Sequence, residues 1–114
     1  MRRINRWVVV VRPKPKFYDW ANSLGGDRPD LTPREFVGDA TILLIPDQED
    51  HDSAETQVVS RHEQLFEHFL GLRDGDPKLW PEHRSLDMFY DWFDVEIHAN
   101  AIDLVQGRIK FVEL

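Results

Sequence analysis

The chain has 114 residues, close to the commonest size of one domain, and two halves of it would each be too small to bury a stable core unaided. Hydrophobic residues make up 41% and charged residues 31%, which is enough apolar surface for a folded chain and argues against disorder. Cysteine is absent, which excludes disulfides, thiolate metal sites and cysteine nucleophiles and fits a reducing compartment.

The charge is distributed unevenly along the chain. The formal net charge is −7, but residues 1–16 hold six basic residues and no acidic one, so the remainder carries −13. An acidic body repels nucleic-acid phosphates, and we expect no nucleic-acid partner. The apolar run 7–11 is shorter than the core of a secretory signal, and no run approaches a membrane span. We therefore expect a cytoplasmic protein without membrane contact.

The first elements are a strand and a short helix. Residues 6–12 contain a run of β-branched residues without a polar face, which predicts a strand that is central or covered on both faces. A helix is predicted over 15–24, because apolar residues recur there at helical spacing after Pro15 and two glycines follow.

A second strand–helix pair follows a polar loop. Residues 32–35 (TPRE) read as a capping box, which predicts a brief helix to about Val37. Residues 40–46 form another apolar run and predict a second strand. If it shares a sheet with 6–12, the connection is expected to be a right-handed parallel crossover. The longest helix is predicted over 53–72.

The last third is expected to hold a helix and two or three strands. Ser85 can cap a short helix over 85–92. From Asp94 the apolar period changes to two, which predicts a strand over 94–105, broken or unbroken at Asn100. A turn at 106–107 then leads to a last strand over 108–113, expected to be an antiparallel hairpin partner.

These elements predict an α+β fold. We expect a single two-layer domain over 1–114, with a mixed sheet of four to five strands covered by the helices 15–24, 53–72 and 85–92. A ferredoxin-like arrangement is the alternative.

One candidate site is the polar side of the predicted strand 94–105. Asp94, Glu96 and His98 lie at i, i+2 and i+4, so their side chains share one face. Carboxylates and an imidazole could bind a metal or exchange a proton. The same alternation is found in any strand with one wet face, and three such residues span about 13 Å, too far for one centre to bind all three without a bulge.

A second candidate is a small-anion site at Arg12, Lys14 and Lys16, next to a helix start. If the first two strands are parallel neighbours, this segment and the acidic 47–52 stretch lie at one sheet edge, where α/β proteins bind ligands. No glycine-rich phosphate loop is present, so ordinary helix capping, charge pairing and solvation explain the segment better than an anion site does.

A third candidate is an interaction face formed by Trp80, Tyr90 and Trp92, since aromatic residues are enriched among interface anchors. Core packing is the commoner role of such a cluster. The sequence contains no nucleophile elbow and no complete zinc or calcium motif, so it predicts neither a bound metal nor a cofactor.

Several short stretches carry a resemblance to known sequences: 9–14 (VVVRPK), 17 (F), 19–24 (DWANSL), 79–81 (LWP), 88–89 (MF) and 92–98 (WFDVEIH). With these stretches the chain resembles a group of short uncharacterised bacterial proteins. The resemblance implies a bacterial cytosolic protein and brings no activity, cofactor or catalytic residue with it.

These observations favour a non-enzymatic module that binds another protein or pairs with itself. A narrower hypothesis is an antitoxin-like or immunity-like protein, whose acidic body neutralises a basic effector. The alternatives are a small metal-dependent or acid/base enzyme that uses Asp94, Glu96 and His98, and a small-anion-binding protein.

Overall fold

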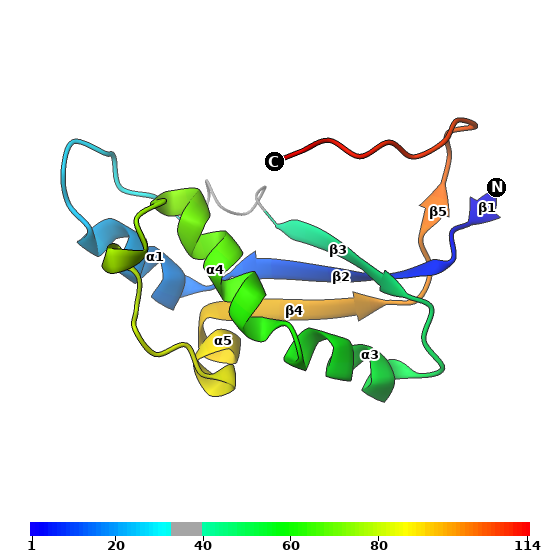
Figure 1. Ribbon diagram of the computed structural model, residues 1–114, viewed down its shortest axis with the longest axis horizontal. Helices are drawn as coiled ribbons and strands as arrows, with labels where there is room; N and C mark the ends of the chain where they lie inside the picture. Colours follow the sequence, from blue (N-terminus) through cyan, green and yellow to red (C-terminus); the bar gives the residue numbers. More distant parts are fainter. Residues whose placement is uncertain (33–39) are drawn as a thin grey trace.

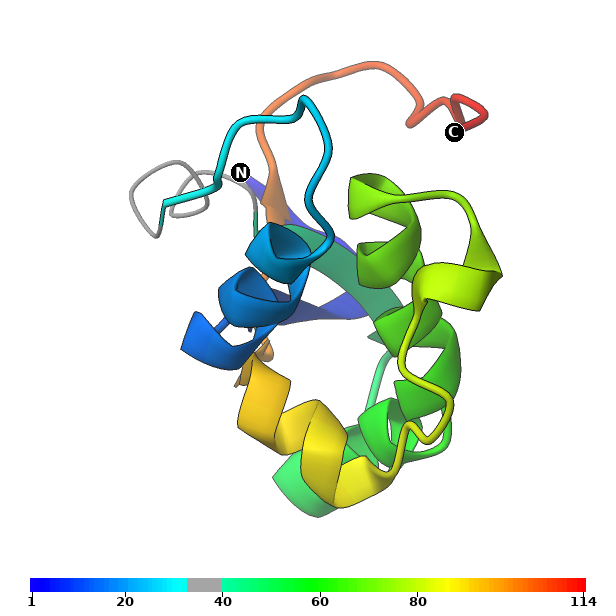
Figure 2. The same ribbon diagram turned by 90° about the vertical axis from the view of Figure 1, so that its left-hand side faces the viewer.

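The computed structural model describes residues 1–32 and 40–114, and within them it confirms an α+β domain. In the described residues four α-helices and one short 3-10 helix accompany five strands in two small antiparallel sheets. The helices cover one face of the larger sheet (Figures 1 and 2). The predicted brief helix after Thr32 falls largely on 33–39, outside the described residues.

The larger sheet has three strands in the order β3-β2-β4. β2 (Arg6–Pro13) is central, and β3 (Thr41–Pro46) and β4 (Phe93–His98) both run antiparallel to it. The smaller sheet pairs β1 (Arg2–Arg3) with β5 (Ile102–Asp103). The strands predicted at 6–12 and 40–46 are thus confirmed, and the 94–105 strand is interrupted between β4 and β5.

The helices follow the predicted positions with one break. α1 (Pro15–Ser23) and α5 (Leu86–Trp92) are confirmed, and a 3-10 helix, η1 (Pro77–Leu79), precedes α5. The single helix predicted over 53–72 is wrong, since it forms α3 (His51–Val59) and α4 (His62–Arg73). The break follows a tightened last turn, in which the Arg61 N–H donates to the Val58 carbonyl three residues earlier.

The predicted parallel crossover and mixed sheet are wrong, because β2 and β3 are antiparallel. α1 continues beyond the end of β2 instead of returning across the sheet, and β3 then starts at that same end (Figure 1). In a ferredoxin-like fold the strands before and after the first helix are parallel and another strand lies between them; here β3 follows α1 and is the direct, antiparallel neighbour of β2, which argues against that alternative.

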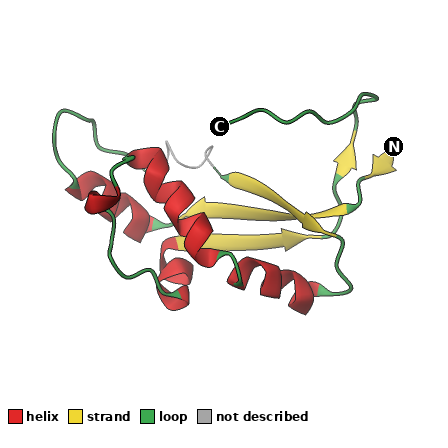
Figure 3. Cartoon of the chain, in the orientation of Figure 1, coloured by secondary structure: helices red, strands yellow, loops and turns green. Residues whose placement is uncertain are grey.

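The predicted strand over 108–113 is also absent. Figure 3 draws the chain after β5 as a loop that runs back along the molecule, and residues 104–114 contain no helix or strand. No hairpin therefore forms at 106–107, and β5 pairs instead with β1, a strand that the sequence did not predict.

The core lies between the sheet and the helices. Along β2 the odd-numbered residues are buried, Val9 and Val11 completely, while Val8, Val10 and Arg12 are half-buried. Aromatic rings fill the centre, where Phe93 of β4 contacts Phe66 and Phe69 of α4. The alternate burial of β2 shows that the helices cover only one of its two faces.

Candidate interaction surface

The face of the three-stranded sheet that points away from the helices is partly apolar. In the β2–β3 ladder Val8 is paired with Leu44, and Val10 with Ile42, so these four side chains share that face. Leu44 keeps 51% of its surface exposed and Ile42 keeps 64%. We call this side of β2, β3 and β4 the open face, because no helix of the described residues covers it (Figures 1 and 2).

The β4 side of the open face is charged. Val10 is paired with Glu96, Val8 with His98 and Arg12 with Asp94. The predicted trio Asp94, Glu96 and His98 therefore does share one face. The open face is apolar along β3 and polar along β4, with β2 between them.

Glu96 is the centre of the charged part. One carboxylate oxygen lies 2.7 Å from Nη1 of Arg12, and the other lies 3.2 Å from Nε2 of His98. The hydrogen bond from His98, followed by the charge of Arg12, lowers the pKa of Glu96. In the described chain no group of three or more His, Asp or Glu residues is placed to hold a metal ion. The contacts of Glu96 therefore orient the side chains of Arg12 and His98 on the protein surface.

The three basic residues of the predicted anion site do not converge on the acidic 47–52 stretch. Because β2 and β3 are antiparallel, the two segments lie at opposite ends of the sheet. Lys14 Nζ donates to the carbonyl of Tyr90 over 3.0 Å, and Lys16 lies 3.4 Å from the Asp91 carboxylate. The basic side chains thus contact β4 and α5.

The three aromatic residues predicted as an interaction face are half-buried against the core. The indole of Trp92 contacts Phe17 and Phe66, and Tyr90 packs edge to face with Phe89. Trp80 donates its indole N–H to the carbonyl of Asp74 over 2.8 Å. Each ring therefore has a structural role in the helical layer.

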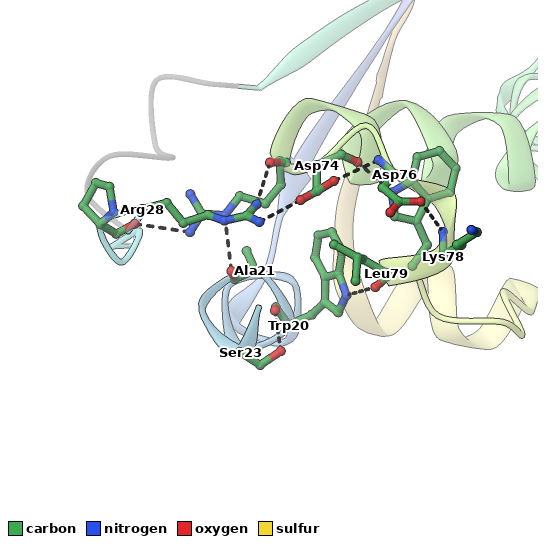
Figure 4. Close-up of polar contacts among 11 residues, drawn as sticks. Trp20, Ala21, Ser23, Arg28, Asp74, Asp76, Lys78 and Leu79 are labelled. Atoms are coloured by element: carbon green, nitrogen blue, oxygen red, sulfur yellow. Dashed lines mark hydrogen bonds and ion pairs between the residues drawn. The ribbon is translucent and has the colours of Figure 1, made fainter. Parts of the chain in front are cut away.

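A polar network fastens the chain around Asp74, at the end of α4 (Figure 4). Nη2 of Arg28 lies 2.7 Å from the Asp74 carboxylate, and the Asp76 N–H donates to the other carboxylate oxygen over 2.8 Å. The backbone hydrogen bond from Asp76, then the bond from Arg28, lower the pKa of Asp74. Arg73 and Trp20 add bonds to the carbonyls of Ala21 and Leu79 over 3.2 Å each.

A groove lies beside β3. It has a volume of about 730 Å³ and is bounded by β3 and by side chains of α3 and α4, among them Val58, Leu65, His68 and Leu72. Leu114, far along the chain, also lines it. Among the described residues β3 pairs only with β2, so its outer edge is free beside this groove.

The sequence did not single out Ile42 or Leu44, because a continuous apolar run predicts burial on both faces. The short length of the run and Pro46 at its end do indicate an edge strand, since short strands with a terminal proline are common at sheet edges.

The chain matches no protein-family model, no curated protein and no solved structure. In the described parts of the chain no helix is both long enough and apolar enough to cross a membrane.

Proposed function

We propose that this protein is a non-enzymatic protein-interaction module and that its contact surface is the open face. The observation that carries the proposal is the exposure of Ile42 and Leu44 next to Val8 and Val10 on one side of the sheet. A contiguous apolar patch of this kind on a small protein is typical of a binding surface.

The charged residues beside the patch support the same proposal. Protein interfaces commonly combine an apolar centre with a polar border that fixes orientation. Arg12, Glu96 and His98 are held together by short contacts at that border, so their positions are set before a partner arrives. Such preorganisation reduces the entropy that binding must overcome.

The charge of the whole chain adds a preference for the partner. With a net charge of −7 the protein attracts a basic surface and repels an acidic one. This agrees with the narrower hypothesis of an antitoxin-like or immunity-like role, in which the partner is a basic effector encoded nearby. Absence of a basic neighbour in the operon would remove the reason for that narrower version.

The test compares two substitutions of the same chemistry. Leu44→Asp places a charge on the open face, whereas Leu79→Asp changes a leucine of similar exposure (44%) in η1, on the helical layer. The solution mass of each variant and the proteins it captures from lysate are measured beside the wild type. We expect self-association or capture to be lost with Leu44→Asp and kept with Leu79→Asp.

The proposal fails if the wild type is a monomer at every concentration and retains no protein whose capture depends on Leu44. Circular dichroism of both variants checks that a loss does not reflect unfolding. Because Leu44 is half-exposed, its replacement should leave the fold intact.

A further inference from the structure

The free edge of β3 is able to accept another strand. Among the described residues its backbone pairs only with β2, so alternate N–H and C=O groups on the outer side lack a strand partner. The adjoining groove is lined by Val58, Leu65 and Leu72, and it offers apolar contacts to side chains of an added strand. An extended peptide that pairs with a free edge and places alternate side chains in a groove is a recurrent mode of recognition.

Residues 104–114, which we call the tail, have the properties of such a strand. Ile109 and Phe111 alternate with Arg108 and Lys110, which is the spacing of a strand. Apolar side chains of the tail are nevertheless exposed: Phe111 keeps 96% of its surface exposed and Val112 keeps 86%. The tail is therefore an apolar strand-like segment without a place in the described sheets.

The tail passes close to β3. It runs from β5, near the end of β3, back above the sheet (Figure 1), and it crosses from the side of β1 and β5 to the side of α4 (Figure 2). Leu114 lines the groove beside β3, and Ile109 and Phe111 line a second cavity; Leu44 of the open face lines both. Apolar residues of the tail thus already lie next to β3.

The tail does not occupy this edge within its own chain. In the described residues no hydrogen bond joins 104–114 to β3, and the tail's own side-chain bond runs from the Val105 N–H to Asp103. The cavity of about 790 Å³ lies between Ile109 and Phe111 of the tail and the start of the chain, and Leu114 is the one tail residue at the groove of about 730 Å³ beside β3. Each chain thus has a strand-like tail and a free β3 edge that do not pair with each other.

We propose that two copies of this chain exchange tails, so that residues 108–114 of each copy lie antiparallel along the free β3 edge of the other. This inference rests on the proposed interaction role and names the partner as a second copy. Each copy donates one strand and accepts one, which closes both edges symmetrically. Ile109 and Phe111 then cover Ile42 and Leu44, while Val112 and Leu114 enter the groove.

The charges of the two segments favour an antiparallel orientation of residues 108–114 along β3. In the antiparallel arrangement Arg108 and Lys110 at the start of the donated segment come beside the end of β3, where the acidic stretch with Asp47 and Glu49 follows. Two acidic molecules that would otherwise repel each other thus meet through the basic part of one and an acidic part of the other.

The first experiment measures hydrogen exchange of the full-length protein together with its solution mass. We expect a dimer in which 41–46 and 108–114 are both protected. Phe111→Asp should abolish the dimer and remove protection from both segments. Leu104→Asp changes another exposed apolar residue of the tail (78% exposed), outside the donated segment, and should change neither.

The second experiment uses the absence of natural cysteine. Leu44→Cys and Phe111→Cys are made in separate chains, mixed and oxidised. We expect a disulfide between the two different chains in preference to either chain with itself. The same two substitutions in one chain should yield a cross-linked dimer.

Three results would overturn the exchange. One is cross-linking confined to a single chain, with protection independent of concentration, because the tail would then dock on its own β3. Another is the absence of protection at 41–46 and 108–114 in the wild type. The third is a dimer lost with Leu44→Asp and unaffected by Phe111→Asp, in which case the open face still mediates pairing and only the exchange fails.

Discussion

Val10 of β2 and Ile42 of β3 are paired across the open face, and Ile42 keeps 64% of its surface exposed. One residue away along β2, Val9 is completely buried beneath the helices. The same apolar run therefore serves two purposes, since one side of the strand builds the core and the other is left for contact.

Substitutions on the two sides of the sheet should lower the free energy of unfolding by very different amounts. Phe66→Ala removes a completely buried ring and should lower the free energy of unfolding by about 3–5 kcal/mol. Ile42→Thr keeps a β-branched side chain at an exposed strand position and should stay within about 0.5 kcal/mol of the wild type. Urea denaturation of dilute protein measures both, and comparable losses would show that the open face is covered.

Gly71 offers a stabilising substitution in α4. A Cβ at this position would lie 3.6 Å from Cζ2 of Trp80, which is an ordinary van der Waals contact. Because alanine is favoured over glycine in a helix, Gly71→Ala should raise the free energy of unfolding by about 0.5–1 kcal/mol. The melting temperature tests this, and a decrease would indicate that Trp80 packs more closely against α4 than described.

Acid should destabilise the protein partly through Asp74. Its pKa is lower in the folded chain than the 3.8 of an unperturbed aspartate, because the folded state binds the carboxylate through Asp76 and Arg28. A lowered folded pKa stabilises the fold above the unfolded pKa, and that contribution disappears as the pH falls through the folded value. Stability should thus drop below about pH 4.

Asp74→Asn provides the measurement. The variant should be less stable at pH 7, and its stability should decline less between pH 5 and pH 2 than that of the wild type. Asp19→Asn, an exposed residue of α1, is the matched control and should leave the decline unchanged. An identical pH profile for Asp74→Asn and the wild type would contradict the role of the Asp74 network.

The pH should also act on the border of the open face. Glu96 has a lowered pKa through His98 and Arg12, so its charge persists to lower pH than that of an unperturbed glutamate. If this border orients a partner, association should weaken as the pH falls through the lowered pKa of Glu96. Glu96→Gln should weaken association at pH 7 with little change in melting temperature. The control, Glu49→Gln in the loop after β3, should change neither association nor melting temperature.

Periodicity located most of the elements correctly. The i, i+3, i+4 spacing around Phe17 identified α1, and the alternation after Asp94 identified β4, because both patterns arise from burial of one side of a regular element. It could not give strand direction, since this depends on where α1 lies relative to β2. Nor could it show that a strand with two apolar sides, such as β3, is covered on only one.

The candidate site was predicted in part. Asp94, Glu96 and His98 share a face as expected from their spacing, but the apolar partners Ile42 and Leu44 come from a strand about 50 residues away, and only the β2 ladder brings them together. Strand-like alternation at 108–111 was recognised, yet pairing requires an acceptor edge, and local sequence does not encode one.

Binding of protein through the open face should be visible in the solution mass measured over a wide concentration range. The chain has a mass of 13.5 kDa. We predict that the wild type and Leu79→Asp form a species of twice this mass, while Leu44→Asp remains at 13.5 kDa and keeps its fold. A single mass of 13.5 kDa for all three proteins, with no captured protein that depends on Leu44, would show that the open face does not bind protein.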